Sequence, residues 1–421
     1  MYMEQAGLRE YKLLSLKGAV QQYAWGGYTF IPKLLGFSGE TGKPYAEYWL
    51  GAHDNAPSLL LLPGAPASPS TDPLTKLNQF IAEAPAENLG RYTADRFGRL
   101  PYLLKILDVR DMLSIQVHPS KKNAEIEFAE ENKKGIPLNA PDRNYKDDNH
   151  KPELMVALSD FWLLHGFKPA DRLRRILQET PELRFLTPVF EEKGYQGLYR
   201  TVMQLEPLKV NEVLQPLLDR IIPAYQDNLL SKDQEDFWAA RAALTFNEPG
   251  RIDKGIFSVY LFNLVNLQPG EAIFQDAGLP HAYLEGQNVE IMANSDNVLR
   301  GGLTPKHIDV PELLRHIKFE ETVPRSIRGS DSDGHISLFH TPAPDFELSR
   351  IGLLKGEGII ISARSVEIFI VLQGELIVEE GPQNSFPRRM GEAFVIFDKG
   401  QVELRAQKDT ILYRAAVPMP K

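Results

Sequence analysis

The feature that most limits the folds open to this chain is the separation of two hydrophobic periodicities along it. Short apolar runs broken by Gly and Pro, typical of β-strands, occupy both ends of the sequence and resume at Ile256. Apolar spacing of three and four residues, typical of helices, is sustained across residues 168–247, where Ser231 begins a capping-box sequence. The sequence therefore predicts a mainly β protein with a helical insert at residues 168–250.

The C-terminal part of the chain shows many short strands with turns. The pattern between Phe346 and Pro418 is typical of a small antiparallel barrel. The run from Glu367 to Glu375 resembles the cupin signature. Ile361 and Ala363 are apolar, although they occupy the positions at which cupins carry metal-binding histidines. We therefore expect this barrel to hold no metal.

Polar and apolar side chains alternate from Ser114 to His118. On a β-strand this period of two places Ser114, Gln116 and His118 on one face and the intervening residues on the other. A hydroxyl, an amide oxygen and an imidazole in a row suit a metal with an anion nearby. A half-exposed edge strand would show the same alternation, so this segment alone leaves both interpretations open.

A lysine interrupts the apolar run just upstream. The runs Tyr102–Leu107 and Met112–His118 are separated by Asp108–Asp111, a spacing that predicts an antiparallel hairpin. Lys105 lies inside the first run. Its charge either reaches solvent at a sheet edge or faces an anion beside Ser114.

Three further segments carry polar residues at predicted strand ends. Because Pro152 can open a strand, Glu153 is expected to begin one, unless it is a solvated edge residue. His281 and Tyr283 share strand parity and point to one side, although a lone histidine is more often structural. Arg300 precedes a glycine pair that a ligand can approach closely, and a surface turn arginine is the alternative.

Composition restricts the kind of site that the chain can build. Its 421 residues include no cysteine, so any metal must be held by nitrogen and oxygen atoms. The formal net charge of −9 argues against a nucleic-acid partner but allows a small anion in a locally basic pocket. The N-terminal Met1–Tyr11 has no apolar run, and no window holds the ~18 apolar residues that cross a bilayer. We expect no membrane association and a cytoplasmic location.

Taken together, the motifs resemble a known family. The segments that carry the resemblance are Tyr23–Gly26, Pro44–Glu47, Ser114–Pro119, Asn149–Glu153, Pro280–Tyr283 and Ser295–Lys306. They are similar to those of type I mannose-6-phosphate isomerase (phosphomannose isomerase), a family of zinc-dependent bicupin enzymes with an inserted helical domain. The resemblance implies two cupin, jelly-roll type β-barrels. It divides the chain into a discontinuous catalytic domain (1–167 and 251–325), the helical insert (168–250) and a metal-free cupin-like domain (326–421).

The resemblance also implies site residues. The zinc ligands of the family fall on Gln116, His118, Glu153 and His281, and its active-site arginine falls on Arg300. Two imidazoles, a carboxylate and an amide oxygen independently suit one Zn²⁺ per chain.

Two roles in the site are less sharply defined by sequence. The candidates for proton transfer are Glu290, Lys151 and Tyr283, with Glu290 preferred because its strand is expected to follow that of His281. The candidates for binding a phosphate group are Ser114, Lys105 and Lys306, and no Gly-rich phosphate loop is present.

The implied activity is aldose–ketose isomerisation of mannose 6-phosphate and fructose 6-phosphate through an enediolate. Zinc would polarise the O1/O2 end of the open-chain sugar, and Arg300 would stabilise the enediolate. We expect a monomer that binds a small sugar phosphate. The family's mannose 6-phosphate feeds the synthesis of GDP-mannose. Two rivals are another metal cupin enzyme, such as an iron oxygenase, and a non-catalytic sugar-phosphate-binding bicupin. In the second rival the first barrel would be expected to have lost its ligands too.

Overall fold

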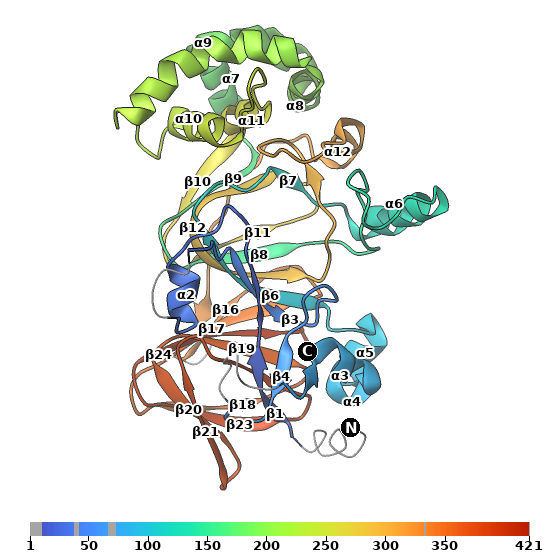
Figure 1. Cartoon of the computed structure of the whole chain (residues 1–421), viewed down its shortest axis with the longest axis vertical. Coiled ribbons are helices and arrows are strands. Elements are labelled where there is room, and N and C mark those ends of the chain that lie inside the picture. The colour runs from blue at the N-terminus through green and yellow to red at the C-terminus, as the bar shows by residue number, and fades with distance from the viewer. Residues whose placement is uncertain (1–10, 38–41, 66–72, 332–333, 421) are drawn as a thin grey trace.

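The computed structural model describes residues 11–37, 42–65, 73–331 and 334–420. Within these residues the chain is mainly β-sheet with some helices, as the sequence predicts (Figure 1). Its strands form three sheets whose ladders are all antiparallel. Residues 1–10 of the N-terminal segment lie outside the described part. No helix among the described residues is long and apolar enough to cross a membrane.

The eleven-stranded sheet occupies the middle of the molecule (Figure 1). Its main path runs β14 (Ile327–Arg328), β11 (Glu271–Gln275), β8 (Glu153–Ala157), β12 (His281–Ala293), β6 (Tyr102–Val109), β3 (Glu47–Gly51) and β2 (Ala19–Gln21). Off this path lie β7 (Gln116–Val117), β9 (Phe161–Phe167), β10 (Phe262–Leu267) and β13 (Leu299–Arg300). Strand β12 pairs with β6, β7, β8 and β9, which makes it the central element of the sheet.

Two further sheets lie below the eleven-stranded sheet in the view of Figure 1. The nine-stranded sheet runs β15 (Ser330–Asp331), β16 (Ile336–Phe339), β17 (Glu347–Leu353), β24 (Thr410–Ala416), β19 (Glu367–Gln373), β22 (Ala393–Ile396), β1 (Leu13–Lys17), β4 (Leu59–Leu61) and β5 (Thr75–Lys76). The four-stranded sheet runs β18 (Gly358–Ser362), β23 (Gln401–Ala406), β20 (Glu375–Glu380) and β21 (Asn384–Arg389). Strands β1, β4 and β5 come from the start of the chain, so the two ends of the sequence meet in one sheet.

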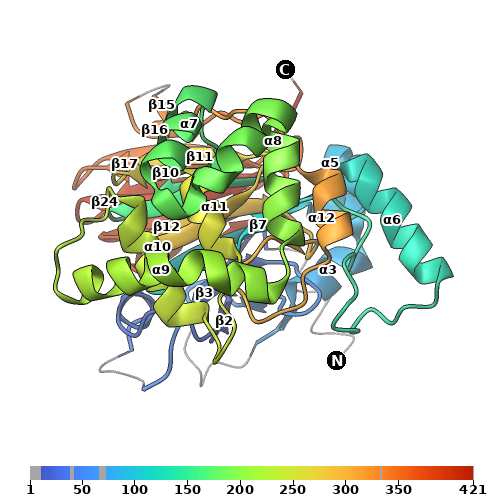
Figure 2. The same cartoon turned by 90° about the horizontal axis from the view of Figure 1, so that it is seen from above.

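Most helices gather at one end and along one side of the molecule, and α2 lies on the opposite side (Figure 1). The group at the end, between β9 and β10 in sequence, consists of α7 (Ala170–Glu179), the 3₁₀ helix η1 (Pro181–Leu186), α8 (Thr187–Gln204), α9 (Pro207–Gln226), α10 (Glu235–Phe246) and α11 (Gly255–Leu261). It covers the end of the eleven-stranded sheet in the view from above (Figure 2). The remaining helices among the described residues are α2 (Phe30–Leu34), α3 (Leu77–Glu83), α4 (Pro85–Asn88), α5 (Arg91–Phe97), α6 (Lys121–Lys133) and α12 (Val310–His316).

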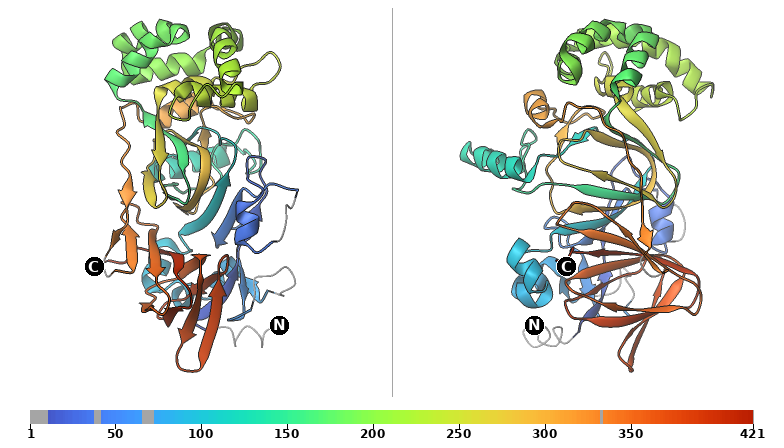
Figure 3. Two further views of the ribbon diagram at one scale, coloured as in Figure 1. Left: turned by 90° about the vertical axis from the view of Figure 1, so that its left-hand side faces the viewer. Right: turned by 180° about the vertical axis from the view of Figure 1, so that it is seen from behind.

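The hydrophobic core follows these layers, which the side views show stacked one above another (Figure 3). One cluster joins the α7–α11 group to the end of the eleven-stranded sheet, with Trp238 and Phe257 fully buried in it. A second fills the space between the eleven-stranded and nine-stranded sheets. A third lies between the nine-stranded and four-stranded sheets and includes Ile361 and Ala363. These two apolar residues are therefore core residues, as their chemistry indicates.

The predicted hairpin at Asp108–Asp111 is wrong. Strand β6 continues to Val109 and pairs with β3 and β12, whereas β7 pairs with β12 and β13. The carbonyl oxygen of Trp25 accepts hydrogen bonds from the amides of Arg110 and Asp111, which turns the chain away from β6.

Two predictions in the helical segment need correction. The run at Ile256 begins as helix α11, all of whose residues are buried, and β structure resumes only at Phe262. Periodicity cannot separate a short, wholly apolar helix from a strand. The helix expected from Ser231 starts at Glu235. Gln234 accepts a hydrogen bond from the Ser231 amide, but the Ser231 hydroxyl bonds to Asp233 rather than capping the helix.

Candidate metal centre

Three neighbouring strands bring the predicted metal ligands together. Glu153 is the first residue of β8, and it pairs with Met292 of β12. His281, the first residue of β12, pairs with Gln116 of β7. Directly opposed residues of a ladder project to the same face, so Gln116 and His281 share one side of the sheet.

The side chains of His118, Glu153 and His281 converge. One potential ligand atom from each lies within 4.8 Å of the others. Glu153 Oε1 is 3.4 Å from His118 Nε2, and Glu153 Oε2 is 3.2 Å from His281 Nε2. The three residues are 0–4% exposed. Two imidazoles and a carboxylate thus close around one point inside the protein.

Backbone carbonyl groups fix the orientation of both imidazoles. His118 Nδ1 donates to the carbonyl oxygen of Asn297 at 2.8 Å, and His281 Nδ1 donates to that of Leu279 at 2.9 Å. A carbonyl oxygen can only accept, so each Nδ1 carries the proton and each Nε2 of a neutral ring has a free lone pair. Burial lowers the pKa of His118 to about 4, against the attraction of Glu153. His118 is therefore neutral at pH 7.

The carboxylate of Glu153 is ionised. Burial alone would raise its pKa, but the adjacent charge of Lys151 outweighs burial and holds the pKa of Glu153 well below its usual range. Lys151 Nζ lies 3.2 Å from Glu153 Oε1. The lysine that the sequence offers for proton transfer is thus placed against the carboxylate at the centre.

The other two proton-transfer candidates form a separate buried network with a lysine. Tyr283 donates a hydrogen bond of 2.7 Å to Glu290 Oε2, and Lys105 Nζ lies 3.3 Å from Glu290 Oε1. Lys105 is also 3.7 Å from Glu47. Burial and the charge of Glu153 raise the pKa of Glu290. Burial would lower the pKa of Lys105, yet Glu47 and Glu290 outweigh it and raise that pKa.

Tyr283 and Glu290 lie on one strand, which corrects the prediction that the Glu290 strand follows the His281 strand. The ladder register shifts between Tyr283 and Glu285, and Gly286 has φ of +127°. A Cβ at Gly286 would lie 2.7 Å from the Asp160 carbonyl oxygen. The irregularity changes the parity of β12, so an odd-numbered and an even-numbered residue contact each other.

The remaining predicted residues lie on β13 and in the segments that adjoin β7 and β13. Arg300 of β13 is half-buried and pairs with Gln116 in the β7 ladder, and burial lowers its pKa. Lys306 is exposed, and partial loss of solvent around its ammonium group together with the charge of Arg300 lowers its pKa. Ser114 is half-buried just before β7. Positive charge therefore gathers where β13 leaves the sheet.

The residues present fit a zinc ion. His118 Nε2 is buried without a hydrogen-bond partner among the described residues, a costly state for a polar atom that a metal would relieve. Nitrogen and carboxylate oxygen ligands with a hydrogen-bonded outer shell are those that catalytic zinc prefers.

Comparison with known proteins decides the family. A sequence profile described as phosphomannose isomerase type I, catalytic domain, matches residues 13–170. The mannose-6-phosphate isomerase of Escherichia coli (strain K12) is 34% identical over 400 residues, which cover 93% of this chain and 96% of that protein. The Homo sapiens mannose-6-phosphate isomerase is also 34% identical, over 96% of this chain and 98% of that protein. The chain belongs to the mannose-6-phosphate isomerase family.

Solved structures of this mannose-6-phosphate isomerase family have the same fold. The mannose 6-phosphate isomerase of Salmonella typhimurium bound to its substrate fructose 6-phosphate and to zinc aligns with a TM-score of 0.85 and 33% identity, over 97% of this chain and all of that one. A zinc-bound holo structure aligns with a TM-score of 0.83. The family expected from the sequence motifs is confirmed.

Several residues that contact the predicted site segments were not predicted from the sequence. His53 Nε2 lies 3.2 Å from Asp296, and Trp49 contacts the ring of His53 edge-on. Gln275 of β11 pairs with Glu153 across the ladder and donates to the Tyr283 hydroxyl at 3.3 Å. Asp296 lies in Ser295–Lys306, one of the segments that carry the family resemblance, so the sequence could have indicated it. His53 and Gln275 lie in segments without a polar pattern of their own.

Proposed function

We infer that this protein is a zinc-dependent aldose–ketose isomerase that interconverts mannose 6-phosphate and fructose 6-phosphate. The observation that carries this inference is the unpartnered Nε2 of His118, which faces Glu153 and His281 inside the protein. His118, Glu153, His281 and Gln116 would hold the ion. When bound, zinc would supply Lewis-acid polarisation of the sugar oxygens at C1 and C2.

The chain's own residues must move a proton between two neighbouring carbons. We assign this step to Glu290, because it is a buried carboxylate whose pKa is raised by burial and by the charge of Glu153, so that it accepts a proton more readily than an exposed carboxylate. Tyr283 donates to Glu290 and orients its carboxylate. Burial and Glu290 raise the pKa of Tyr283 well above its usual value, which keeps the phenol protonated and leaves no phenolate to accept the substrate proton. Lys151 is the competing candidate, since it borders the centre through Glu153.

Negative charge develops on the sugar oxygens as the proton leaves. Arg300 lies opposite Gln116, so its guanidinium is carried on the strand next to the proposed ligands. A fixed cation that becomes more strongly bound as the enediolate forms lowers the barrier to reaction. We assign stabilisation of the enediolate to Arg300.

The phosphate group requires a cation that is not already neutralised. Lys105 is paired with Glu47 and Glu290, whereas no ion pair of Lys306 or Arg300 is formed within the described residues. We therefore rank Lys306 first as the phosphate-binding residue, with Ser114 second and Lys105 third. A Lys105→Met protein that binds the sugar phosphate as tightly as the wild type would remove Lys105 from this set.

The domain organisation of the chain is also part of this proposal. We propose two cupin-type barrels, a catalytic one from residues 1–167 and 251–325 and a metal-free one from residues 326–421, joined to a helical domain at residues 168–250. Strands β1, β4 and β5 are shared with the second barrel, since they pair into its sheet. We further propose that the protein is a monomer and acts in the cytoplasm. The mannose 6-phosphate that it forms would serve the synthesis of GDP-mannose.

Isotope exchange tests the assignment of the proton carrier. The zinc-loaded wild type should form fructose 6-phosphate from mannose 6-phosphate in D₂O and incorporate deuterium at C1. Glu290→Gln should reduce formation and incorporation together by about 10²-fold to 10⁴-fold. Lys151→Met is the matched comparison. If Lys151→Met abolishes deuterium entry while Glu290→Gln retains it, the base is Lys151. If no variant or wild type forms fructose 6-phosphate, the isomerase function is wrong.

A further inference from the structure

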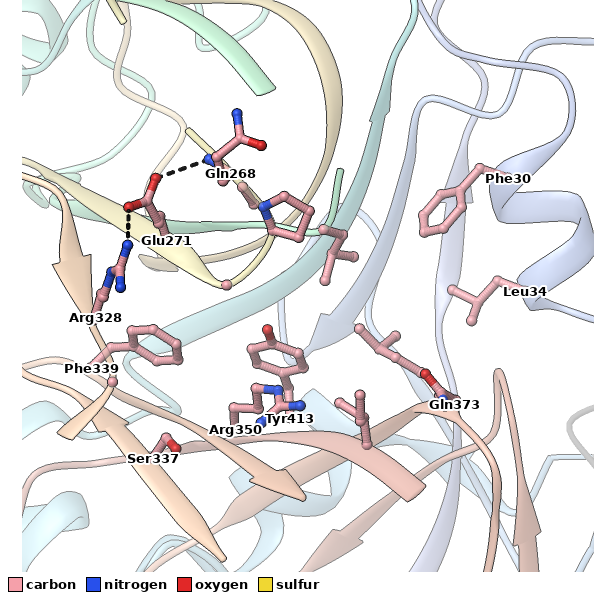
Figure 4. A pocket seen from close by; sticks show the side chains of 17 residues that line it. Phe30, Leu34, Gln268, Glu271, Arg328, Ser337, Phe339, Arg350, Gln373 and Tyr413 are labelled. Carbon is pink, nitrogen blue, oxygen red and sulfur yellow. Dashed lines mark hydrogen bonds and ion pairs between the residues drawn. The ribbon is translucent and has the colours of Figure 1, made fainter. Parts of the chain in front are cut away.

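A cavity lies between the eleven-stranded and nine-stranded sheets, apart from the metal centre. Its volume is about 630 Å³, within the range of sites for small organic ligands. The β8–β9 and β10–β11 connections line one side, and strands β16, β17 and β24 line the other (Figure 4). None of the residues proposed to bind zinc or sugar phosphate borders it.

A row of three polar side chains crosses the floor of this cavity. Ser337 of β16 pairs with Arg350 of β17, which pairs in turn with Tyr413 of β24. Directly opposed residues project to the same face, so the three side chains stand next to one another. In Figure 4 the Tyr413 hydroxyl points into the cavity beside Arg350. Together they offer a hydroxyl, a guanidinium and a phenol to one ligand group.

The guanidinium of Arg350 is half-buried and has no hydrogen bond or ion pair within the described residues. The Tyr413 side chain is buried, and its hydroxyl likewise has no hydrogen-bond partner in the described part of the chain. The other arginine of the cavity differs, because Arg328 lies 3.1 Å from Glu271 and neutralises it. The cavity thus carries one uncompensated positive charge, on Arg350.

The rest of the lining is largely apolar. Phe30 and Leu34 of α2 face the cavity from one side (Figure 4), and Phe339, Leu372 and Ile411 add further apolar lining. An unpaired guanidinium beside a phenol and apolar walls matches a ligand with one acidic head and an apolar body. Arginine binds the two oxygens of a carboxylate through its planar fork of N–H donors.

We propose that this cavity binds a small organic carboxylate with an apolar body, held by Arg350 and Tyr413. The single net positive charge matches a monoanion. The site is independent of the proposed isomerase function. The cavity and the metal centre nevertheless share strand β8. Glu153 is its first residue and Ala157, which lines the cavity, is its last, about 13 Å further along the strand.

Binding of 1-naphthoate to the zinc-loaded full-length protein tests this proposal. Naphthoate fluorescence should show one saturable site per chain, unaffected by saturating mannose 6-phosphate. Neutral 1-naphthamide and acetate, which each lack one half of the ligand, should bind at least tenfold more weakly. Arg350→Gln should weaken naphthoate binding at least tenfold, because a charge-assisted contact is lost. The surface variant Arg91→Gln should change it less than threefold.

Two variants of Gln373 test the proposal independently if Arg350→Gln does not fold. Gln373 lines the cavity and is exposed, so its replacement leaves the core intact. Gln373→Glu should weaken naphthoate binding about threefold to fivefold, and Gln373→Lys should strengthen it by a similar factor. Three results would overturn the proposal: no saturable binding at millimolar naphthoate, competition with mannose 6-phosphate, or equal affinity in Gln373→Glu, Gln373→Lys and the wild type.

Discussion

The Nδ1 atom of His118 lies 2.8 Å from the backbone carbonyl oxygen of Asn297, and this contact ties an imidazole of the metal centre to the segment Ser295–Lys306. Asn297 is itself fixed by its side chain. Asn297 Nδ2 donates to the backbone carbonyl oxygens of Asp147 and Asn149, and Asn297 Oδ1 accepts from the backbone amide of Lys146. One buried asparagine therefore sets the direction of His118 and holds the loop that leads to Glu153.

Replacing Asn297 should weaken metal binding without removing a ligand. In Asn297→Ala the backbone carbonyl remains but loses its anchor, so we expect zinc affinity to fall about 10-fold to 100-fold. Competition with a chromophoric chelator measures this. Asn384→Ala on the distant strand β21 is the control and should bind zinc as the wild type does. A folded Asn297→Ala protein with unchanged affinity would show that the anchor is dispensable.

Arg300→Ala should act on turnover more than on binding. If Arg300 stabilises the enediolate, kcat should fall about 10²-fold to 10³-fold while KM changes far less. Steady-state kinetics with mannose 6-phosphate give both values. The solvent-exposed Arg91→Ala serves as a control. A variant with near-normal kcat and a raised KM would instead assign Arg300 to the binding of the phosphate group.

Lys105→Met should destabilise the fold. The substitution leaves Glu47 and Glu290 buried without the cation that pairs with both. Breaking a buried ion pair from one side costs about 3–5 kcal/mol of unfolding free energy. Urea unfolding measures this loss, and Lys133→Met on the surface of α6 should change the free energy by less than about 0.5 kcal/mol. A loss below about 1 kcal/mol for Lys105→Met would contradict the network.

Acid should destabilise the protein partly through Glu312 of α12. Burial would raise the pKa of Glu312, but hydrogen bonds with His316 and Tyr145 outweigh it and lower the pKa from 4.5 to about 2. Because the folded-state pKa lies below the unfolded one, this stabilisation is complete above the unfolded value of 4.5 and is lost as pH falls toward 2.

Urea unfolding of chelator-treated protein between pH 6 and pH 2.5 measures the effect of Glu312, since the chelator removes any contribution from metal release. Glu312→Gln should be less stable than the wild type at pH 6, and the difference should shrink as the pH falls. A difference that stays constant over this range would mean that the carboxylate charge contributes nothing.

Much of the β structure could be predicted because it depends on local pattern. Glu153 begins β8 directly after Pro152, and His281 and Tyr283 face one side of β12. These features follow from the missing amide hydrogen of proline and from strand periodicity. The helices between Ala170 and Phe246 follow equally from their apolar spacing.

The rest of the site depends on contacts between distant segments. The register shift beyond Tyr283, which lets that residue meet Glu290, has no marker other than Gly286. The pairing of Lys105 with Glu47 arises because β3 and β6 are adjacent, an order that local periodicity does not contain. Sheet order is set by the packing of the whole core, so it could not be read from either strand alone.

The most direct test is a zinc titration of chelator-stripped protein, followed by metal content and by the rate of fructose 6-phosphate formation from mannose 6-phosphate. Four donor groups around one ion predict a rate that rises linearly and stops at one zinc per chain, and a Glu153→Gln protein that neither retains zinc nor turns over. Full activity in the stripped wild type, or a zinc-loaded Glu153→Gln protein as active as the wild type, would contradict this account of the centre.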